Sequence, residues 1–419
     1  MSSDAMSSEL ADNVRNHRRR AGFSQERLAE AARVSPALVR KVEQGGTPRV
    51  ETLYALARAL GVTTSALFAT GAPEPVRDDG PNHLRLMEIR RALMPPVGLK
   101  EAVAAAGESP PSPAQVIRRE IADAHALYQT DRYDSVAKRL PGITRAAETA
   151  VSAHDGDEER RRALDVRAQA FLLTGKYLTQ VRQYDLAYYA LSQAIRDARE
   201  AGHTLTAATG VVGLSWLLLR QDRFDECESL AGATADEMEP RVSTAAPGQI
   251  AVWGELSLRV ASAAMRDNRP DTAREARRMA STAASALGVE HTDFGSHWTT
   301  FGPVTAEMKA VEDLSLIGDA HGVLRRSDDG VLSRKGMKAA GKPSSNNWDR
   351  HRLDVARAHV MLGSHHDAMH ELNALRRTSP EWVRHQAMAR YVMADVLHHR
   401  KRTLTKDMRE MAAHLGITG

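Results

Sequence analysis

Two pairs of histidines are the residues of this 419-residue sequence that could most readily bind a metal ion. His366 and His370 are four positions apart, so a helix would place both imidazoles on one face. No glutamate stands at the offset that the helical metalloprotease motif requires, and His398 and His399 show no metal-binding motif either. We interpret both pairs as parts of solvated helix faces, and we predict no metal site and no cofactor.

Other catalytic motifs are missing as well. The sequence has no phosphate-binding loop and no G-x-S-x-G nucleophile motif, and we assign its one strand-like apolar run, 211–219, to a buried helix. Cys227 is the sole cysteine, which is typical of proteins of the reducing cytoplasm. The sequence shows no run of about 18 apolar residues and no signal peptide. We therefore expect an all-α, cytoplasmic protein that does not contact a membrane and is not an enzyme.

The stretch FSQERLAEAARVSPALVRKVEQG (23–45) has the pattern of two short helices joined by a tight turn. Each half carries apolar residues at helical spacing, namely Leu28, Ala29, Val39 and Val42. Ser35 can cap the second helix, and Pro36 suits its first turn. The flanking sequence extends the pattern to five predicted helices, at 8–20, 24–32, 36–44, 50–60 and 64–68.

Residues 9–69 resemble the Cro/C1-type (XRE) family of helix-turn-helix domains, which implies a lambda-repressor-like fold. The resemblance is carried by Arg15, Arg18, Ser24-Gln25-Glu26, Leu28-Ala29, Val34-Ser35, Val39, Val42-Glu43, Gly45, Glu51-Thr52-Leu53, Ala57, Ala59-Leu60-Gly61-Val62 and Leu67-Phe68. One position departs from the family, because Arg33 replaces the glycine of the turn. A left-handed backbone there would cost about 1 kcal/mol.

The resemblance implies a specific face for DNA. In this family the second helix of the motif enters the major groove, and the positions carried over are Gln25, Ser35, Pro36, Ala37, Arg40, Lys41, Gln44 and Arg49. Arg40 is the expected base reader, because its guanidinium can pair with guanine O6 and N7. Pro36 and Ala37 suit a thymine methyl group, while Gln25, Lys41, Gln44 and Arg49 suit the phosphate backbone.

Further expectations follow from the same resemblance. We interpret Arg18 and Glu43 as an internal ion pair, and Arg19 and Arg20 as a solvated basic face. Because one such domain touches few base pairs, we expect a homodimer on double-stranded DNA with an inverted-repeat operator.

The remaining chain divides into a linker and a helical region. Eight of the 17 prolines fall in residues 71–113, which predicts a linker between a domain at 1–70 and another at 114–419. Within it, 83–94 has the pattern of an amphipathic helix that docks on either domain or on a partner chain.

Residues 114–419 repeat weakly. Similar segments start at 131, 182, 222, 268 and 364, and each has an aspartate that can cap a helix. The spacings of 51, 40, 46 and 96 exceed the usual tetratricopeptide period of 34. The region resembles degenerate tetratricopeptide repeats, so we expect stacked helix pairs with a concave binding surface.

A helix-turn-helix followed by such repeats is similar to the layout of peptide-sensing quorum regulators and of large XRE regulators of actinobacteria. This implies a peptide or small-molecule signal, and the candidate ligand-binding residues are Trp216, Arg220, Gln249, Trp253, Trp298, Phe301, Asn347 and Arg350. Each tryptophan could instead simply fill the core between helices. An alternative is that the repeats dock a protein partner and the chain is a DNA-tethered regulator.

Overall fold

The computed structural model describes residues 3–46, 48–62, 64, 67, 81–98, 101–102, 112–154, 156–293, 299–399 and 403–417. Their regular secondary structure is almost entirely helical, so the predicted all-α class is confirmed. The exceptions are two short antiparallel hairpins, β1 (Val97–Gly98) with β2 (Glu101–Ala102) and β3 (His291–Asp293) with β4 (Thr299–Phe301).

The N-terminal domain is built around the predicted helix-turn-helix. Its helices are α1 (Ser3–Arg20), α2 (Gln25–Ala31), α3 (Pro36–Glu43) and α4 (Val50–Ala59). Val14, Leu28, Val39, Leu56 and Leu67 meet in one buried core. Hydroxyl groups cap both motif helices, as Ser24 accepts from the backbone of Arg27 and Ser35 from that of Leu38. Of the predicted fifth helix, only Thr64 and Leu67 belong to the described residues.

The predicted amphipathic helix of the linker is α5 (Pro81–Leu93), and it docks on the helical region. Ile89 and Leu93 are fully buried in the core that α7 shares with its neighbours. Arg85 forms an ion pair with Asp134, at 3.2 Å. Residues 71–80 and 103–111 of the predicted linker lie outside the described part of the chain.

Six helical hairpins form the body of the molecule within the described residues. They are α6 (Ala114–Gln129) with α7 (Tyr133–Ser152), α8 (Asp157–Gln180) with α9 (Tyr184–Glu200), α10 (Thr204–Arg220) with α11 (Phe224–Glu237), α12 (Pro247–Arg266) with α13 (Pro270–Leu287), α14 (Pro303–Leu316) with α15 (Ala320–Arg326), and α17 (Ser345–Met361) with α18 (His365–Thr378). The predicted buried helix at 211–219 lies within α10.

All six hairpins use the same turn. In each, one residue has positive φ, namely Asp131, Arg182, Asp222, Asn268, Gly318 or Gly363. The next backbone N–H donates to the carbonyl five residues earlier, at 2.8–3.0 Å, which is the Schellman way of ending a helix. Asp, Asn and Gly tolerate this left-handed conformation well, whereas Arg182 is less suited to it.

The repeats seen in the sequence correspond to these turns. The five predicted segments begin at or next to a left-handed residue, and the sixth turn, at Gly318, lies in the gap of 96 residues. The left-handed residues are 51, 40, 46, 50 and 45 positions apart. The helical region therefore contains stacked hairpins, with a longer period than tetratricopeptide repeats have.

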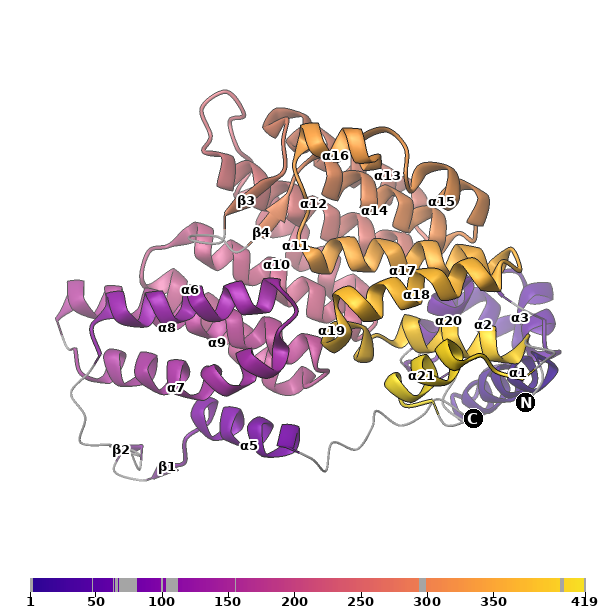
Figure 1. Cartoon of the computed structure of the whole chain (residues 1–419), viewed down its shortest axis with the longest axis horizontal. Helices are drawn as coiled ribbons and strands as arrows, with labels where there is room; N and C mark the ends of the chain where they lie inside the picture. The colour runs from indigo at the N-terminus through magenta and orange to yellow at the C-terminus, as the bar shows by residue number, and fades with distance from the viewer. Residues whose placement is uncertain are drawn as a thin grey trace.

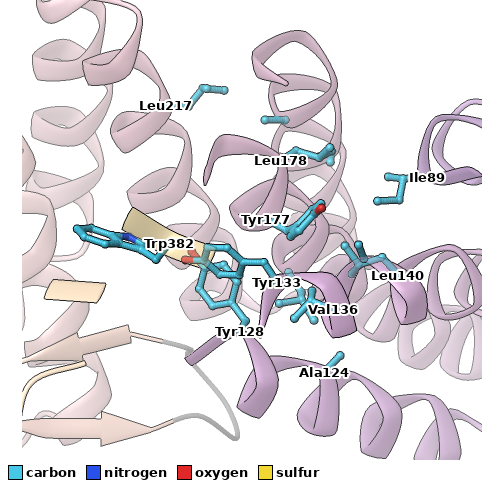
Figure 2. Packing of buried hydrophobic residues seen from close by; sticks show 14 of the residues in the cluster. Ile89, Ala124, Tyr128, Tyr133, Val136, Leu140, Tyr177, Leu178, Leu217 and Trp382 are labelled. Carbon is cyan, nitrogen blue, oxygen red and sulfur yellow. The ribbon is translucent and has the colours of Figure 1, made fainter. Parts of the chain in front are cut away.

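The stack of hairpins closes on itself. The chain continues through η2 (Gly330–Leu332) and α16 (Arg334–Ala340), and it ends with α19 (Pro380–Arg384), α20 (Ala387–His398) and α21 (Lys406–His414). The backbone N–H of Trp382 donates to Asp131 Oδ2 at 3.0 Å, and the Tyr133 hydroxyl donates to Asn346 Oδ1 at 3.2 Å. Trp382 is fully buried in the same core as Tyr128 and Tyr133 (Figure 2). We call this closed assembly, α6 to α21, the ring (Figure 1).

Candidate nucleic-acid interface and interior cavity

Helix α3 offers one face to solvent and buries the other. Val39 and Val42 are in the domain core, as the apolar spacing predicts. The residues predicted to face DNA from α3 and its flanks are exposed even in the full chain, namely Ser35, Pro36, Ala37, Arg40, Lys41, Gln44 and Arg49. A surface of this kind, with short side chains in the first turn of α3 and the cations Arg40 and Lys41 in its last turn, suits a major groove.

A buried carboxylate fixes the position of α3 in the domain. Glu43 is 2% exposed and accepts from Arg18 Nε at 2.6 Å and from Arg18 Nη2 at 3.0 Å. The predicted Arg18–Glu43 ion pair is thus confirmed. Gln25 Nε2 also donates to Glu43, at 2.6 Å, so Gln25 braces the helix from α2. Burial favours a higher pKa for Glu43, but hydrogen bonds from Arg18 and Gln25 outweigh it and lower that pKa.

Arg40, the expected base reader, is held only loosely. Its side chain is 52% exposed, and Nη1 lies 3.8 Å from Glu26 Oε1. Exposed pairs of this kind contribute about 0–1 kcal/mol, so DNA can displace Glu26 at little cost. The turn before α3 has the left-handed backbone that the family pattern implies, with Arg33 at a φ of 54°.

The fold and the exposed face of α3 define the class of the N-terminal domain, a DNA-binding helix-turn-helix domain. Comparison with protein families agrees, because residues 14–67 match the model of the helix-turn-helix family. No curated protein matches the chain. No solved structure matches it either. The XRE-type resemblance of the first domain is therefore supported, as is its role in binding DNA for transcription regulation.

Among the described residues, no helix is both long and apolar enough to span a membrane.

The DNA-binding domain docks on the ring through α4 and Thr64. The Tyr54 ring meets Phe224 edge to face, with centroids 5.6 Å apart. Arg58 Nε lies 2.6 Å from Asp267 Oδ1. Thr64 donates from its backbone and its hydroxyl to Asp222 Oδ2, at 2.5 and 3.0 Å. Asp222 is the left-handed residue of the α10–α11 turn, so a hairpin turn of the ring holds this domain.

Two predicted DNA contacts lie close to this junction. Lys41 and Arg49 line a shallow groove between the domain and the ring, together with Asn268 of the α12–α13 turn. Both side chains stay exposed. The junction therefore leaves the face of α3 open while it fixes the domain against the ring.

Behind the junction lies a cavity of about 590 Å³. Its wall is formed by α10, α12, α14, α17 and α20 of the ring, and by Tyr54 and Thr64 of the DNA-binding domain. Among the described residues that line it, eight are arginine or lysine and three are aspartate or glutamate. The interior of the ring thus carries an excess of positive charge.

Part of this charge is neutralised locally. Glu312 pairs with Arg266 and with Lys309, whose Nζ lies 2.6 Å from Glu312 Oε2. Arg259 pairs with Glu255 at 3.0 Å. The Arg266–Glu312 pair joins α12 to α14, and the three pairs together account for three of the lining cations.

Four other lining arginines form no ion pair with any described residue, and one of them, Arg357, donates instead to the Ser315 carbonyl at 3.1 Å. Within the described part of the chain, Arg182, Arg220 and Arg350 form no ion pair, and the Nε atoms of Arg182 and Arg220 have no hydrogen-bond partner. Arg220 and Arg350 both lie over the Trp216 ring, 5.3 and 5.9 Å from its centroid. Burial, together with repulsion from Arg350, lowers the pKa of Arg220 from its ordinary value. Burial likewise lowers the pKa of Arg350.

The structure brings only some of the predicted ligand-binding residues to this cavity. Trp216, Arg220 and Arg350 line it. Four others lie elsewhere. Gln249 Oε1 accepts from the backbone of Ala246 at the start of α12, and Asn347 Nδ2 donates to Thr300 Oγ1 at 3.3 Å.

The aromatic candidates away from the cavity fill the core. Trp253 and Phe301 are buried between α12 and its neighbours, which matches the alternative that such rings serve packing. Trp298 lies outside the described residues.

Sequence reasoning missed the cations on α12 and α14. Arg259 and Arg266 are seven residues apart, and Lys309 and Glu312 are three apart, so each pair shares one helix face. The spacing indicates that the charged residues of each helix lie on one face. It does not indicate that this face lines the interior of the ring.

A small cluster of possible metal ligands also forms away from both sites. His365, Asp395 and His399 bring their ligand atoms within 4.8 Å of one another. His365 comes from α18, so the neighbours of His399 could not be identified from the sequence. The pair His366 and His370 is exposed, as the solvated-face interpretation expects.

Proposed function

We propose that the protein is a sequence-specific transcription regulator that acts in the cytoplasm as a homodimer on an inverted-repeat operator. The observation that carries this proposal is the exposed face of α3, on which Arg40 contacts only Glu26, while the buried Glu43 fixes the opposite face of the helix. The braced helix lowers the cost of ordering side chains on DNA.

We further propose that the ring binds a signal that controls DNA binding, and that the protein has no catalytic activity. A cavity of about 590 Å³ supports this idea, because small-molecule sites usually have about 300–1,000 Å³. A cavity of this volume suits a small ligand or short peptide better than a docked helix of about 10 Å diameter. This argues against the alternative of a protein partner inside the ring.

Capture of fragmented genomic DNA by the purified protein, followed by sequencing, tests the proposal. We expect a few enriched fragments that contain inverted repeats. The variant Arg40→Ala should lose them, whereas Arg161→Ala, at an exposed position of α8, should keep them. Equal enrichment by wild type and Arg40→Ala would refute the assigned DNA face. Sedimentation of the protein with one captured fragment then counts the copies bound.

A further inference from the structure

We propose that the cavity binds a small organic anion with phosphate or carboxylate groups, and that Tyr54 and Thr64 transmit its presence to the DNA-binding domain. This inference rests on the proposed function, since it names the class of signal and the route by which the signal acts.

The first argument is charge. Arg182, Arg220 and Arg350 line one cavity and form no ion pair with any described residue, and the lining holds eight arginines and lysines against three aspartates and glutamates. Partly buried cations that repel one another are costly unless an anion joins them. Guanidinium groups bind carboxylate and phosphate with two parallel hydrogen bonds, which makes such an anion the matching ligand.

The second argument concerns the body of the ligand. Trp216 offers an aromatic surface next to Arg220 and Arg350, and Leu316 and Leu353 add apolar wall. The volume of about 590 Å³ is far larger than a bare inorganic ion requires. A ligand with an aromatic or apolar body could pack on Trp216, Leu316 and Leu353, while its anionic groups bind the guanidinium groups.

The third argument concerns transmission. Tyr54 and Thr64 belong to the DNA-binding domain and line the cavity. Arg266, which pairs with Glu312, lies 5.9 Å from the centroid of the Tyr54 ring. An anion that attracts Arg266 or repels Asp222 therefore changes the contacts that hold the domain. A ligand shifts an equilibrium only through such differential contacts.

Titration calorimetry on the full-length protein tests the ligand class. The probes are inorganic pyrophosphate, citrate and adenosine triphosphate, with adenosine as the neutral control at matched ionic strength. We expect at least one anion to bind once per chain and adenosine not to bind. Failure of all three anions would overturn the proposal.

Variants then locate the bound anion. Arg220→Gln with Arg350→Gln should weaken anion binding at least tenfold, whereas Arg40→Gln, on the DNA face, should leave it unchanged. If Arg40→Gln weakened anion binding and the Arg220→Gln, Arg350→Gln double variant did not, the anion would bind at the DNA face, and this result would overturn the proposal.

Stability gives an independent readout. Arg350→Met should raise the thermal midpoint of the ligand-free protein while it weakens anion binding, because it removes a partly buried charge that forms no ion pair with a described residue. A purely structural Arg350 would show a lower midpoint instead, which would count against the proposal.

The coupling is measured on a captured operator. The bound anion should change operator affinity at least fivefold, and Arg58→Ala, which removes the ion pair of α4 with Asp267 outside the cavity lining, should reduce that change without abolishing anion binding. An unaltered operator affinity would overturn the transmission step. The two proposals fail separately, because absence of any operator refutes the regulator, while a functional operator without anion binding refutes only this inference.

Discussion

At the scale of single residues, Glu43 fixes the position of α3 in the DNA-binding domain. Its carboxylate is buried and bonded to Arg18 and Gln25, which come from α1 and α2. One side chain of α3 therefore links that helix to α1 and α2. Arg40, in contrast, has only an exposed contact with Glu26, so its side chain stabilises the fold little and is available for a contact with DNA.

Glu43→Gln should destabilise the DNA-binding domain by about 3 kcal/mol at pH 7, because it leaves the Arg18 cation without its buried partner. Urea unfolding of both proteins measures the difference. The pKa of Glu43 is lowered in the folded state, so its stabilisation is complete above the ordinary carboxyl pKa and disappears as pH falls through the folded value. The difference in the free energy of unfolding between wild type and Glu43→Gln should therefore become smaller below about pH 4.5. A gap that is constant with pH would contradict the ionic role of Glu43.

Arg33→Gly should stabilise the same domain by about 0.5–1 kcal/mol, because glycine adopts the left-handed backbone at φ 54° without strain. The control is Arg27→Gly, within α2, which should cost about 1 kcal/mol. Thermal unfolding compares the three proteins. If both variants lose stability equally, the turn carries no strain.

At the scale of elements, the hairpin turns explain both the repeats and the docking. Asp222 ends α10 in a left-handed turn and also accepts two hydrogen bonds from Thr64. The aspartate that begins a repeat in the sequence thus serves the contact between domains as well. Helix α4 completes that contact through Tyr54 and Arg58.

Asp222→Gly keeps the left-handed turn but removes the acceptor. The Thr64 amide should then lose protection from hydrogen exchange, whereas the Leu28 amide in the domain core should keep its protection. Exchange followed by NMR or mass spectrometry measures both. Unchanged protection at Thr64 would show that the junction does not depend on this carboxylate.

The DNA face and most helices could be predicted because they depend on local spacing. Val39 and Val42 are buried and Arg40 is exposed simply through helical periodicity. The hairpin at Gly318 was missed, because its segment lacks the signature of the other five. Closure of the ring was also missed, since the Trp382–Asp131 hydrogen bond joins residues 251 positions apart. The cavity depends on that closure, so its cations could not be grouped from the sequence.

At the scale of the whole molecule, the ring presents one DNA-binding domain beside a cationic interior. Helix α4 fixes the domain on the ring, and the predicted DNA face of α3 stays exposed. In the proposed function, a change inside the ring acts on the DNA face through the contacts that α4 and Thr64 make with the ring.

The salt dependence of operator binding counts the DNA-binding domains involved. Lys41 and Arg49 are the predicted phosphate contacts of each domain, so a homodimer should neutralise about four phosphates. The logarithm of the binding constant should fall against the logarithm of salt concentration with a slope of about −4. A slope near about −2 would indicate that a single domain contacts DNA.

The central claim is that α3 reads the operator through Arg40, and operator affinity tests it most directly. Fluorescence anisotropy on one captured operator would compare wild type, Arg40→Ala and Arg161→Ala at one salt concentration. We predict a loss of about 1–3 kcal/mol for Arg40→Ala, together with lost preference at one guanine of each half-site, and no loss for Arg161→Ala. Unchanged affinity and preference in Arg40→Ala would contradict the account.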